Sequence, residues 1–196
     1  MGRGGIARRA RAGRAAVLLA PLLAGLALGG PALVGTALAQ TATGTPPAFP
    51  TQTFKSWALD CLVPKAGPSA GKRVCFIHHE ARPPADPKHV AARAVIRHTG
   101  PDRKLVLIVE LPPNTVQASG ASAAIDTSPP VAIPLAGCIQ QFCYGALELT
   151  PALQNAIKVG QQMTLDFTPK DNAKQSVAVP LAGVTAALAA LEQTGS

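Results

Sequence analysis

The chain has 196 residues, of which 47% are hydrophobic and only 4% aromatic, and its formal net charge is +8. This length is enough for one domain with its own core. Five arginines and no acidic residue fall within the first 14 positions, so the rest of the chain has 13 basic and 10 acidic residues and a net charge of only +3. Scattered Lys and Arg with few aromatic side chains give no basis for nucleic-acid binding.

The first 39 residues have the pattern of a secretory signal peptide. Five arginines, the last of them Arg14, precede an uncharged stretch over residues 15–34, as in a basic n-region followed by an apolar h-region. Ala37-Leu38-Ala39 has the small residues that a signal peptidase accepts, so we predict cleavage after Ala39. An uncleaved membrane anchor is the alternative, because about 20 apolar residues can span a bilayer. Glycines and Pro31 interrupt this stretch and favour cleavage, which predicts a periplasmic, secreted or outer-surface protein without a stable membrane span.

A flexible leader is expected over residues 40–53, followed by one domain over residues 54–193. In this domain, short apolar runs alternate with clusters of Pro, Gly and Asp, a pattern typical of β-strands. The predicted strands are residues 54–61, 73–79, 90–97, 104–111, 123–126, 131–133, 141–149, 162–167 and 175–179. Alternation in the first strand places Trp57 inward. The continuous apolar run 104–111 predicts a strand buried on both faces.

Two short helices are expected. Thr150 and Pro151 are a suitable N-cap and first helical residue, and Gly160 is a suitable stop. Residues 181–192 place four large apolar side chains at helical spacing, which predicts a C-terminal helix docked on a sheet. These elements together indicate a mostly β fold: a single antiparallel β-sandwich or barrel-like domain with one or two short helices.

All four cysteines lie in the predicted exported part: Cys61, Cys75, Cys138 and Cys143. An even number in an oxidising compartment indicates disulfides. Three pairings are possible, and we favour the one between sequence neighbours, Cys61 with Cys75 and Cys138 with Cys143. A four-cysteine zinc site is the alternative, but zinc ribbons usually have two closely spaced cysteine pairs.

The sequence contains no convincing catalytic pattern. His78 and His79 are adjacent on a predicted strand, so their side chains should point to opposite faces. No serine lies in a G-x-S-x-G turn, and no glycine-rich phosphate loop occurs. The remaining candidates could gather around a proline-rich loop: His79, Glu80, Asp86 and His89. We therefore predict no catalytic, cofactor-binding or metal-binding residue, and a protein that is not an enzyme.

Several short motifs follow one another in a specific order. They are Trp57-Ala58-Leu59-Asp60-Cys61, Cys75-Phe76-Ile77, Glu110-Leu111-Pro112, Ile125-Asp126, Cys138 to Cys143 before Tyr144-Gly145-Ala146, and Val179-Pro180-Leu181-Ala182-Gly183-Val184 followed by Ala187-Leu188. In this order they resemble the invasion-associated locus B family of secreted bacterial proteins, over nearly all of residues 54–191. The chain departs from the family pattern at Phe142, where a glycine is frequent, and at Pro113-Asn114, where an aliphatic-glycine turn is frequent.

This resemblance implies a non-enzymatic protein in the periplasm or on the outer surface of a Gram-negative bacterium, with a link to host-cell entry in some relatives. It brings no catalytic residues to carry over. Our leading hypothesis is a binding or interaction module whose partner is another envelope protein, a surface polymer or a host component. Two alternatives remain: an envelope hydrolase or metalloprotein that uses His79, Asp86 and His89, and a structural factor that stabilises the envelope.

Overall fold

The computed structural model describes residues 49–83, 86–171 and 173–195. The predicted signal peptide, its cleavage site and residues 40–48 of the predicted leader lie outside the described residues. No helix in the described part is both long enough and apolar enough to cross a membrane.

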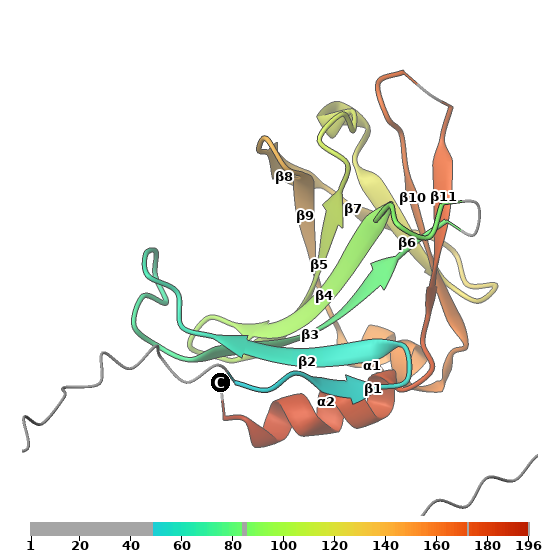
Figure 1. Cartoon of the computed structure of the whole chain (residues 1–196). Coiled ribbons are helices and arrows are strands. Elements are labelled where there is room, and N and C mark those ends of the chain that lie inside the picture. Colours follow the sequence, from blue (N-terminus) through green and yellow to red (C-terminus); the bar gives the residue numbers. More distant parts are fainter. Residues whose placement is uncertain (1–48, 84–85, 172, 196) are drawn as a thin grey trace, which may run out of the picture. The chain divides into compact units, whose positions relative to one another are not determined.

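Two antiparallel sheets form the domain (Figure 1). The larger sheet contains β1 (Gln52–Phe54), β2 (Trp57–Leu62), β3 (Val74–Ala81), β4 (Ala92–Thr99), β5 (Lys104–Leu111), β8 (Leu135–Cys138) and β9 (Cys143–Glu148). The smaller sheet contains β6 (Ala121–Ile125), β7 (Val131–Ile133), β10 (Gln162–Phe167) and β11 (Gln175–Pro180). Their strand orders are β1-β2-β3-β4-β5-β9-β8 and β11-β10-β6-β7. Since each sheet keeps two separate edges, the fold is sandwich-like rather than a closed barrel.

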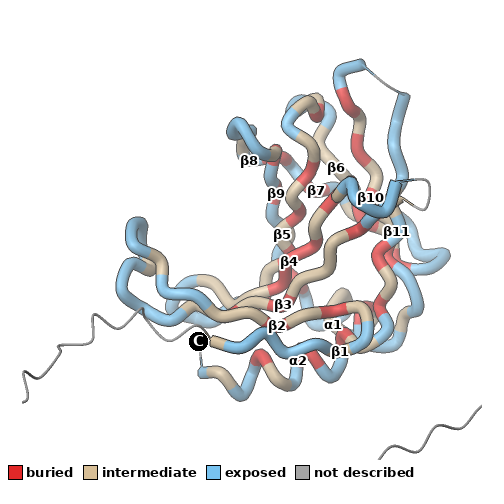
Figure 2. Tube along the Cα trace, in the orientation of Figure 1, coloured by how far each residue is buried: buried red, intermediate tan, exposed pale blue. Residues whose placement is uncertain are grey.

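Buried side chains alternate along the strands and form one core between the sheets (Figure 2). Trp57 is only 1% exposed, so the predicted inward orientation is confirmed. The prediction that strand 104–111 is buried on both faces is wrong. In β5, Leu105, Leu107, Val109 and Leu111 are buried, whereas the residues between them are half-buried. The strand has antiparallel neighbours, β4 and β9, and only one of its faces meets the core.

Two α-helices and one short 3-10 helix (η1, Gln117–Ser119) complete the fold. Helix α1 (Pro151–Val159) begins as predicted, since the Thr150 side chain accepts a hydrogen bond from the Leu153 amide at 3.3 Å. Helix α2 (Val184–Gln193) buries Val184, Leu188 and Leu191 against β1, β2 and β3. The predicted docking of a C-terminal helix on a sheet is therefore confirmed.

The predicted strand 54–61 is in fact the end of one strand, a tight turn and the next strand. β1 starts at Gln52, two residues inside the predicted leader, and pairs with β2 across a two-residue turn in which Lys55 has φ 53°. The Trp57 indole Nε1 donates to the Pro180 carbonyl at 2.9 Å. Gly183 has φ 93°, and a Cβ there would lie 2.0 Å from the Phe54 carbonyl oxygen. Only glycine therefore lets the chain entering α2 pass this close to the β1–β2 hairpin.

Candidate interaction face

The two sides of the larger sheet differ in what covers them. Helix α2 packs on the β1–β3 part of one side, while β7 contacts β9 and the smaller sheet contributes to the same core. We call the opposite side the outer face. Strand register and alternation place the following side chains on it: Asp60, Phe76, His78, Glu80, Arg93, Arg97, Glu110 and Tyr144. The outer face is thus rich in charged and aromatic groups across five strands.

Asp60 and His78 form the first polar pair of the outer face. His78 Nε2 lies 2.8 Å from Asp60 Oδ2, and the Thr51 hydroxyl donates to Oδ1 of the same carboxylate. Burial by itself would raise the pKa of Asp60. The hydrogen bonds from Thr51 and His78 and the electrostatic effects of His78 and Arg93 act in the opposite direction. Together they are larger, so the pKa of Asp60 lies below its usual value. The carboxylate is therefore held in its charged form.

Arg93 connects this pair to the next strands. Its guanidinium lies 3.3 Å from the Glu110 carboxylate and 5.6 Å from the centre of the Phe76 ring. Among the described residues, the buried side-chain nitrogens without a hydrogen-bond partner are His78 Nδ1, Arg93 Nε and Arg97 Nε. All three belong to the outer face. Since buried polar atoms are normally hydrogen-bonded, these three unpaired nitrogens are an unusual feature of this face.

A groove of about 380 Å³ lies where the outer face meets the segment after β5. Charged side chains of both signs, Glu80, Arg93 and Glu110, line one part of it together with His89. An apolar part is lined by Leu111, Pro112, Pro113 and Phe142. We call it the hairpin groove, because Phe142 comes from the tip of the β8–β9 hairpin. The combination of ion pairs and apolar surface suits a polypeptide better than a small substrate.

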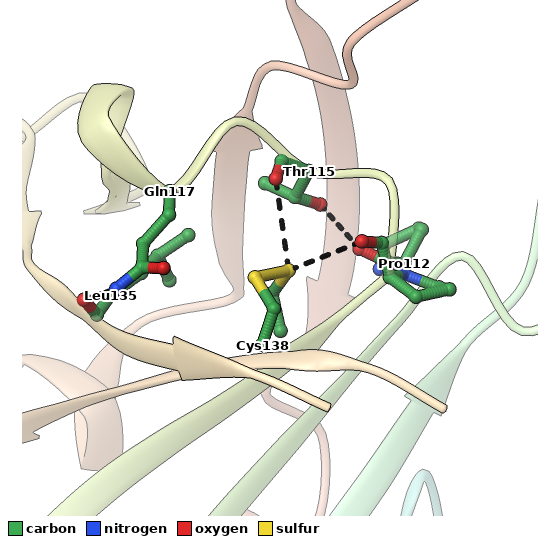
Figure 3. Close-up of a disulfide and its surroundings, with 7 residues drawn as sticks. Pro112, Thr115, Gln117, Leu135 and Cys138 are labelled. Atoms are coloured by element: carbon green, nitrogen blue, oxygen red, sulfur yellow. Dashed lines mark hydrogen bonds between the residues drawn. A yellow bond between two sulfur atoms is a disulfide. The ribbon is translucent and has the colours of Figure 1, made fainter. Parts of the chain in front are cut away.

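A disulfide between Cys138 and Cys143 closes the β8–β9 hairpin (Figure 3). Cys143 Sγ lies 3.6 Å from the Pro113 carbonyl oxygen and 3.7 Å from that of Thr115. A disulfide sulfur has no proton to donate, so these are close packing contacts rather than hydrogen bonds. Thr115 is itself 1% exposed, and its hydroxyl donates to the Pro112 carbonyl at 2.7 Å. The disulfide therefore fastens the hairpin onto the segment that follows β5.

The hairpin tip exposes apolar side chains. Ile139 is 48% exposed and Tyr144 37% exposed, and the rings of Phe142 and Tyr144 meet edge to face at 6.3 Å. Inside the disulfide, the Ile139 amide donates to the Phe142 carbonyl at 2.8 Å, which fixes the loop. A Cβ on Gly137 would lie 3.3 Å from the Tyr144 hydroxyl, so the glycine leaves room for this ring against β8. The tip is therefore a disulfide-bridged aromatic projection beside the hairpin groove.

Strand β8, which supplies this projection, is absent from the predicted strands. Its sequence Leu-Ala-Gly-Cys has little strand propensity, and a register shift interrupts its pairing with β9 between Leu135 and Gly137. The one sequence signal for β8 was the predicted disulfide between the closely spaced Cys138 and Cys143. Such a bridge places the two cysteines on opposed strands of a hairpin.

The second disulfide joins Cys61 to Cys75, which lie directly opposite each other in β2 and β3. The structure thus pairs the cysteines that are neighbours in sequence. Both disulfides fit an exported protein.

The histidines of the proposed metal site do not converge. His78 belongs to the outer face, whereas His79 Nδ1 lies 2.6 Å from the Ser56 carbonyl, so the two adjacent side chains point to opposite faces as predicted. His89 lines the hairpin groove with Glu80. Within residues 49–83, 86–171 and 173–195, no three His, Cys, Asp or Glu side chains are close enough to hold a metal ion. His79, Asp86 and His89 therefore do not form the site that the metalloprotein alternative requires.

Comparisons with known proteins agree with this fold. The family model described as "Invasion associated locus B (IalB) protein" matches residues 57–192. The chain belongs to the IalB family. Among solved structures, invasion associated protein b from Bartonella henselae has 17% sequence identity to this chain, and the match covers 75% of this chain and 97% of that one with a TM-score of 0.63. A search of the curated proteins found no match.

The motifs that suggested the IalB family hold the fold together. Trp57 and Gly183 join the β1–β2 hairpin to the segment before α2, and each cysteine pair bridges two opposed strands. Of these motifs, Glu110-Leu111-Pro112 lines the hairpin groove, as do Gln141 and Phe142 within the Cys138 to Cys143 segment. The tip residue Phe142 is a departure from the family pattern.

Proposed function

We propose that this IalB family member is an exported, non-enzymatic binding protein of the bacterial envelope, and that it holds a protein partner at the β8–β9 hairpin tip and the hairpin groove. The single observation that carries the proposal is the aromatic projection beside the groove. Disulfide-fixed aromatic side chains lose little conformational entropy on binding, and aromatic residues are enriched at the centres of protein interfaces.

The charges in the groove fit the same role. Arg93 and Glu110 are ion-paired on its wall, and Glu80 pairs with Arg82 at its edge. Such a polar margin next to Phe142 has the arrangement of an interface, with an apolar centre and a charged rim. Charged rims chiefly control partner choice and association rate, so the aromatic tip would supply most of the affinity.

Site-specific photocrosslinking in cells tests this proposal. A photoreactive amino acid at Ile139 should crosslink to a discrete partner, and the crosslink should be lost when Phe142→Ala is added. The matched control is the same photoreactive residue at Val159, an apolar position on α1 that is 73% exposed. A crosslinking pattern that is the same at both positions, or that survives Phe142→Ala, would exclude the tip as the binding surface.

Two further measurements address export and the absence of enzymatic activity. Intact-mass spectrometry of protein recovered from the periplasm should give a chain that starts at Gln40, with four cysteines resistant to alkylation. A full-length mass would instead indicate a membrane-tethered protein. Turnover of any substrate that a single substitution in the groove abolishes would contradict the non-enzymatic role.

The word "invasion" in the names of the family and of the Bartonella henselae protein concerns those relatives. For this chain, we propose host-cell contact only as one source of the partner. Strains that carry Phe142→Ala or the wild-type gene can be compared for entry into cultured cells, and equal entry would place the partner in the bacterial envelope instead.

A further inference from the structure

A second groove, of about 550 Å³, lies at the end of the larger sheet formed by the β2–β3 loop (residues 63–73) and the β4–β5 turn (residues 100–103). In Figure 1 both connections lie at the end of the sheet that points away from the smaller sheet. Four basic side chains line this groove: Lys72, Arg73, Arg97 and Arg103. We call it the cationic groove, and it is separate from the hairpin groove.

Acidic residues balance the charge of this groove only in part, since Asp102 in the β4–β5 turn is the neighbour of Arg103 in sequence. None of the ten acidic residues of the chain lines it. Four basic residues outside the groove are paired with acids: Arg82 with Glu80, Arg93 with Glu110, Lys104 with Glu148 and Lys174 with Asp166. Arg103 has one long contact, at 3.9 Å, with Glu192, which also accepts from His98 and lines the neighbouring depression. The groove therefore concentrates positive charge in a molecule whose described part carries little net charge.

Arg97 is the most informative of the four. Its side chain is half-buried, its Nε is buried without a hydrogen-bond partner, and it forms no ion pair with any described residue. Because Arg97 lines the groove and no acid in the described part of the chain neutralises it, an anionic ligand in the groove would meet an uncompensated positive charge. The planar guanidinium matches two oxygens of a phosphate group in a bidentate contact.

The Arg73 side chain and the backbone at Arg103 are held in place before any ligand arrives. Arg73 Nε donates to Cys75 Sγ at 3.3 Å, and its guanidinium lies 5.0 Å from the centre of the Phe49 ring. The Cys61–Cys75 disulfide closes the loop that carries Lys72 and Arg73. On the other wall, His98 Nδ1 lies 2.8 Å from the Arg103 carbonyl and fixes the turn. Such preorganisation reduces the entropy cost of binding.

We propose that the cationic groove binds a phosphate monoester or diester through Arg97, Arg103, Lys72 and Arg73. Two sources can supply this group: a free phosphate compound, or the headgroup of an anionic lipid at a membrane surface. Leu62 at the end of β2 and Val63 at the start of the groove-lining loop are 45% and 44% exposed. An exposed apolar pair next to clustered cations is the combination that peripheral membrane contacts use. The proposal does not depend on the partner at the hairpin tip.

Titration with inorganic pyrophosphate by calorimetry tests the shared chemistry. The mature protein with both disulfides should bind it, with an affinity that falls between 50 and 200 mM salt. The Arg97→Gln/Arg103→Gln variant should bind about tenfold more weakly or worse. The matched control is Lys158→Gln/Lys170→Gln, which removes the same charge from two exposed lysines outside the groove. It should stay within about twofold of the wild type, because screening leaves distant charges little effect.

Vesicle sedimentation distinguishes the two sources. Vesicles with phosphatidylglycerol should carry the protein down, and pure phosphatidylcholine vesicles should not, if the source is a lipid headgroup. In that case Leu62→Ala/Val63→Ala should weaken vesicle binding and leave pyrophosphate binding unchanged. Pyrophosphate binding without vesicle binding would assign a free phosphate compound.

The proposal fails if neither pyrophosphate nor the anionic vesicles bind, or if the Lys158/Lys170 control loses as much as the groove variant. Should Arg97→Gln/Arg103→Gln lower the melting temperature, Lys72→Gln/Arg73→Gln replaces it, since both of these residues are exposed on a loop. Unchanged binding in that second variant would equally overturn the assignment.

Discussion

Removing the Cys61–Cys75 disulfide should lower the free energy of unfolding by about 3 kcal/mol, within a range of about 2 to 5 kcal/mol. The bridge joins directly opposed residues 14 positions apart, so it closes a loop of about 15 residues and restricts the unfolded chain accordingly. Alanine is the better replacement, because Cys75 is 2% exposed and a serine there would bury a hydroxyl.

The Cys138–Cys143 disulfide is an internal comparison. Its cysteines are 5 positions apart, so the same loop-entropy relation gives about 2 kcal/mol for Cys138→Ala/Cys143→Ala. The larger loop should therefore produce the larger loss, by about 1 kcal/mol. A difference in this direction would show that restriction of the unfolded chain dominates both effects.

Urea unfolding followed by the fluorescence of Trp57, the single tryptophan, is a suitable assay because the indole is 1% exposed in the folded protein. Wild-type protein in a strong reductant should unfold like a variant that lacks both bridges. An unchanged free energy in Cys61→Ala/Cys75→Ala would refute the loop-entropy argument. A larger loss from the hairpin pair than from the β2–β3 pair would show that native contacts around Cys143 outweigh loop length.

Three further predictions concern stability and are read from the same urea curves. Thr150→Ala removes the N-cap of α1 and should cost about 1 kcal/mol, and Thr150→Ser should restore most of it. Gly183→Ala should lower the free energy of unfolding by more than about 2 kcal/mol. The control Gly100→Ala, also at positive φ but with open space around it, should lower it less. Equal losses would exclude the clash with Phe54. The pKa of Asp60 is lower in the folded protein than the unfolded value of 3.8, so its charge contributes fully to stability above pH 3.8, and this contribution is lost as the pH falls through the folded pKa. Asp60→Asn should therefore reduce the loss of stability at acid pH. An unaltered loss in this variant would assign it to other carboxyl groups.

Local sequence patterns correctly predicted much of the secondary structure. The runs 104–111 and 162–167 coincide with β5 and β10. The first is a nearly continuous run of aliphatic residues, and the second alternates polar with apolar residues, as in a half-buried strand. Thr150-Pro151 defined the start of α1 for a similarly local reason: the cap and the first helical residue are adjacent in sequence. Sequence patterns failed to predict an element where that element depends on a contact with a distant segment of the chain. The turn at Lys55 is held by the segment around Ala182, 126 positions further along, whose carbonyl accepts from the Ser56 amide at 3.2 Å.

The hairpin groove was only partly foreseeable. Adjacent His78 and His79 were correctly assigned to opposite faces, because side chains alternate along any strand. Which of the two faces would meet the core could not be read from their neighbours. Phe142 was noticed as a departure in the family pattern, but its contact with Tyr144 depends on a hairpin whose first strand has almost no strand propensity.

The sequence by itself determined the class of the protein: the disulfide-bearing β domain, the presence of two helices and the family all follow from neighbouring residues or from their order along the chain, and export stays a prediction of the same kind. Tertiary structure decided where the sites are. In sequence the basic residues looked scattered, yet Lys72, Arg73, Arg97 and Arg103 line one groove, because the antiparallel pairing of β3 with β4 brings the β2–β3 loop and the β4–β5 turn to the same end of the sheet. Strand order and register depend on long-range packing that no local pattern encodes, so surfaces assembled from several strands emerge only in the folded domain.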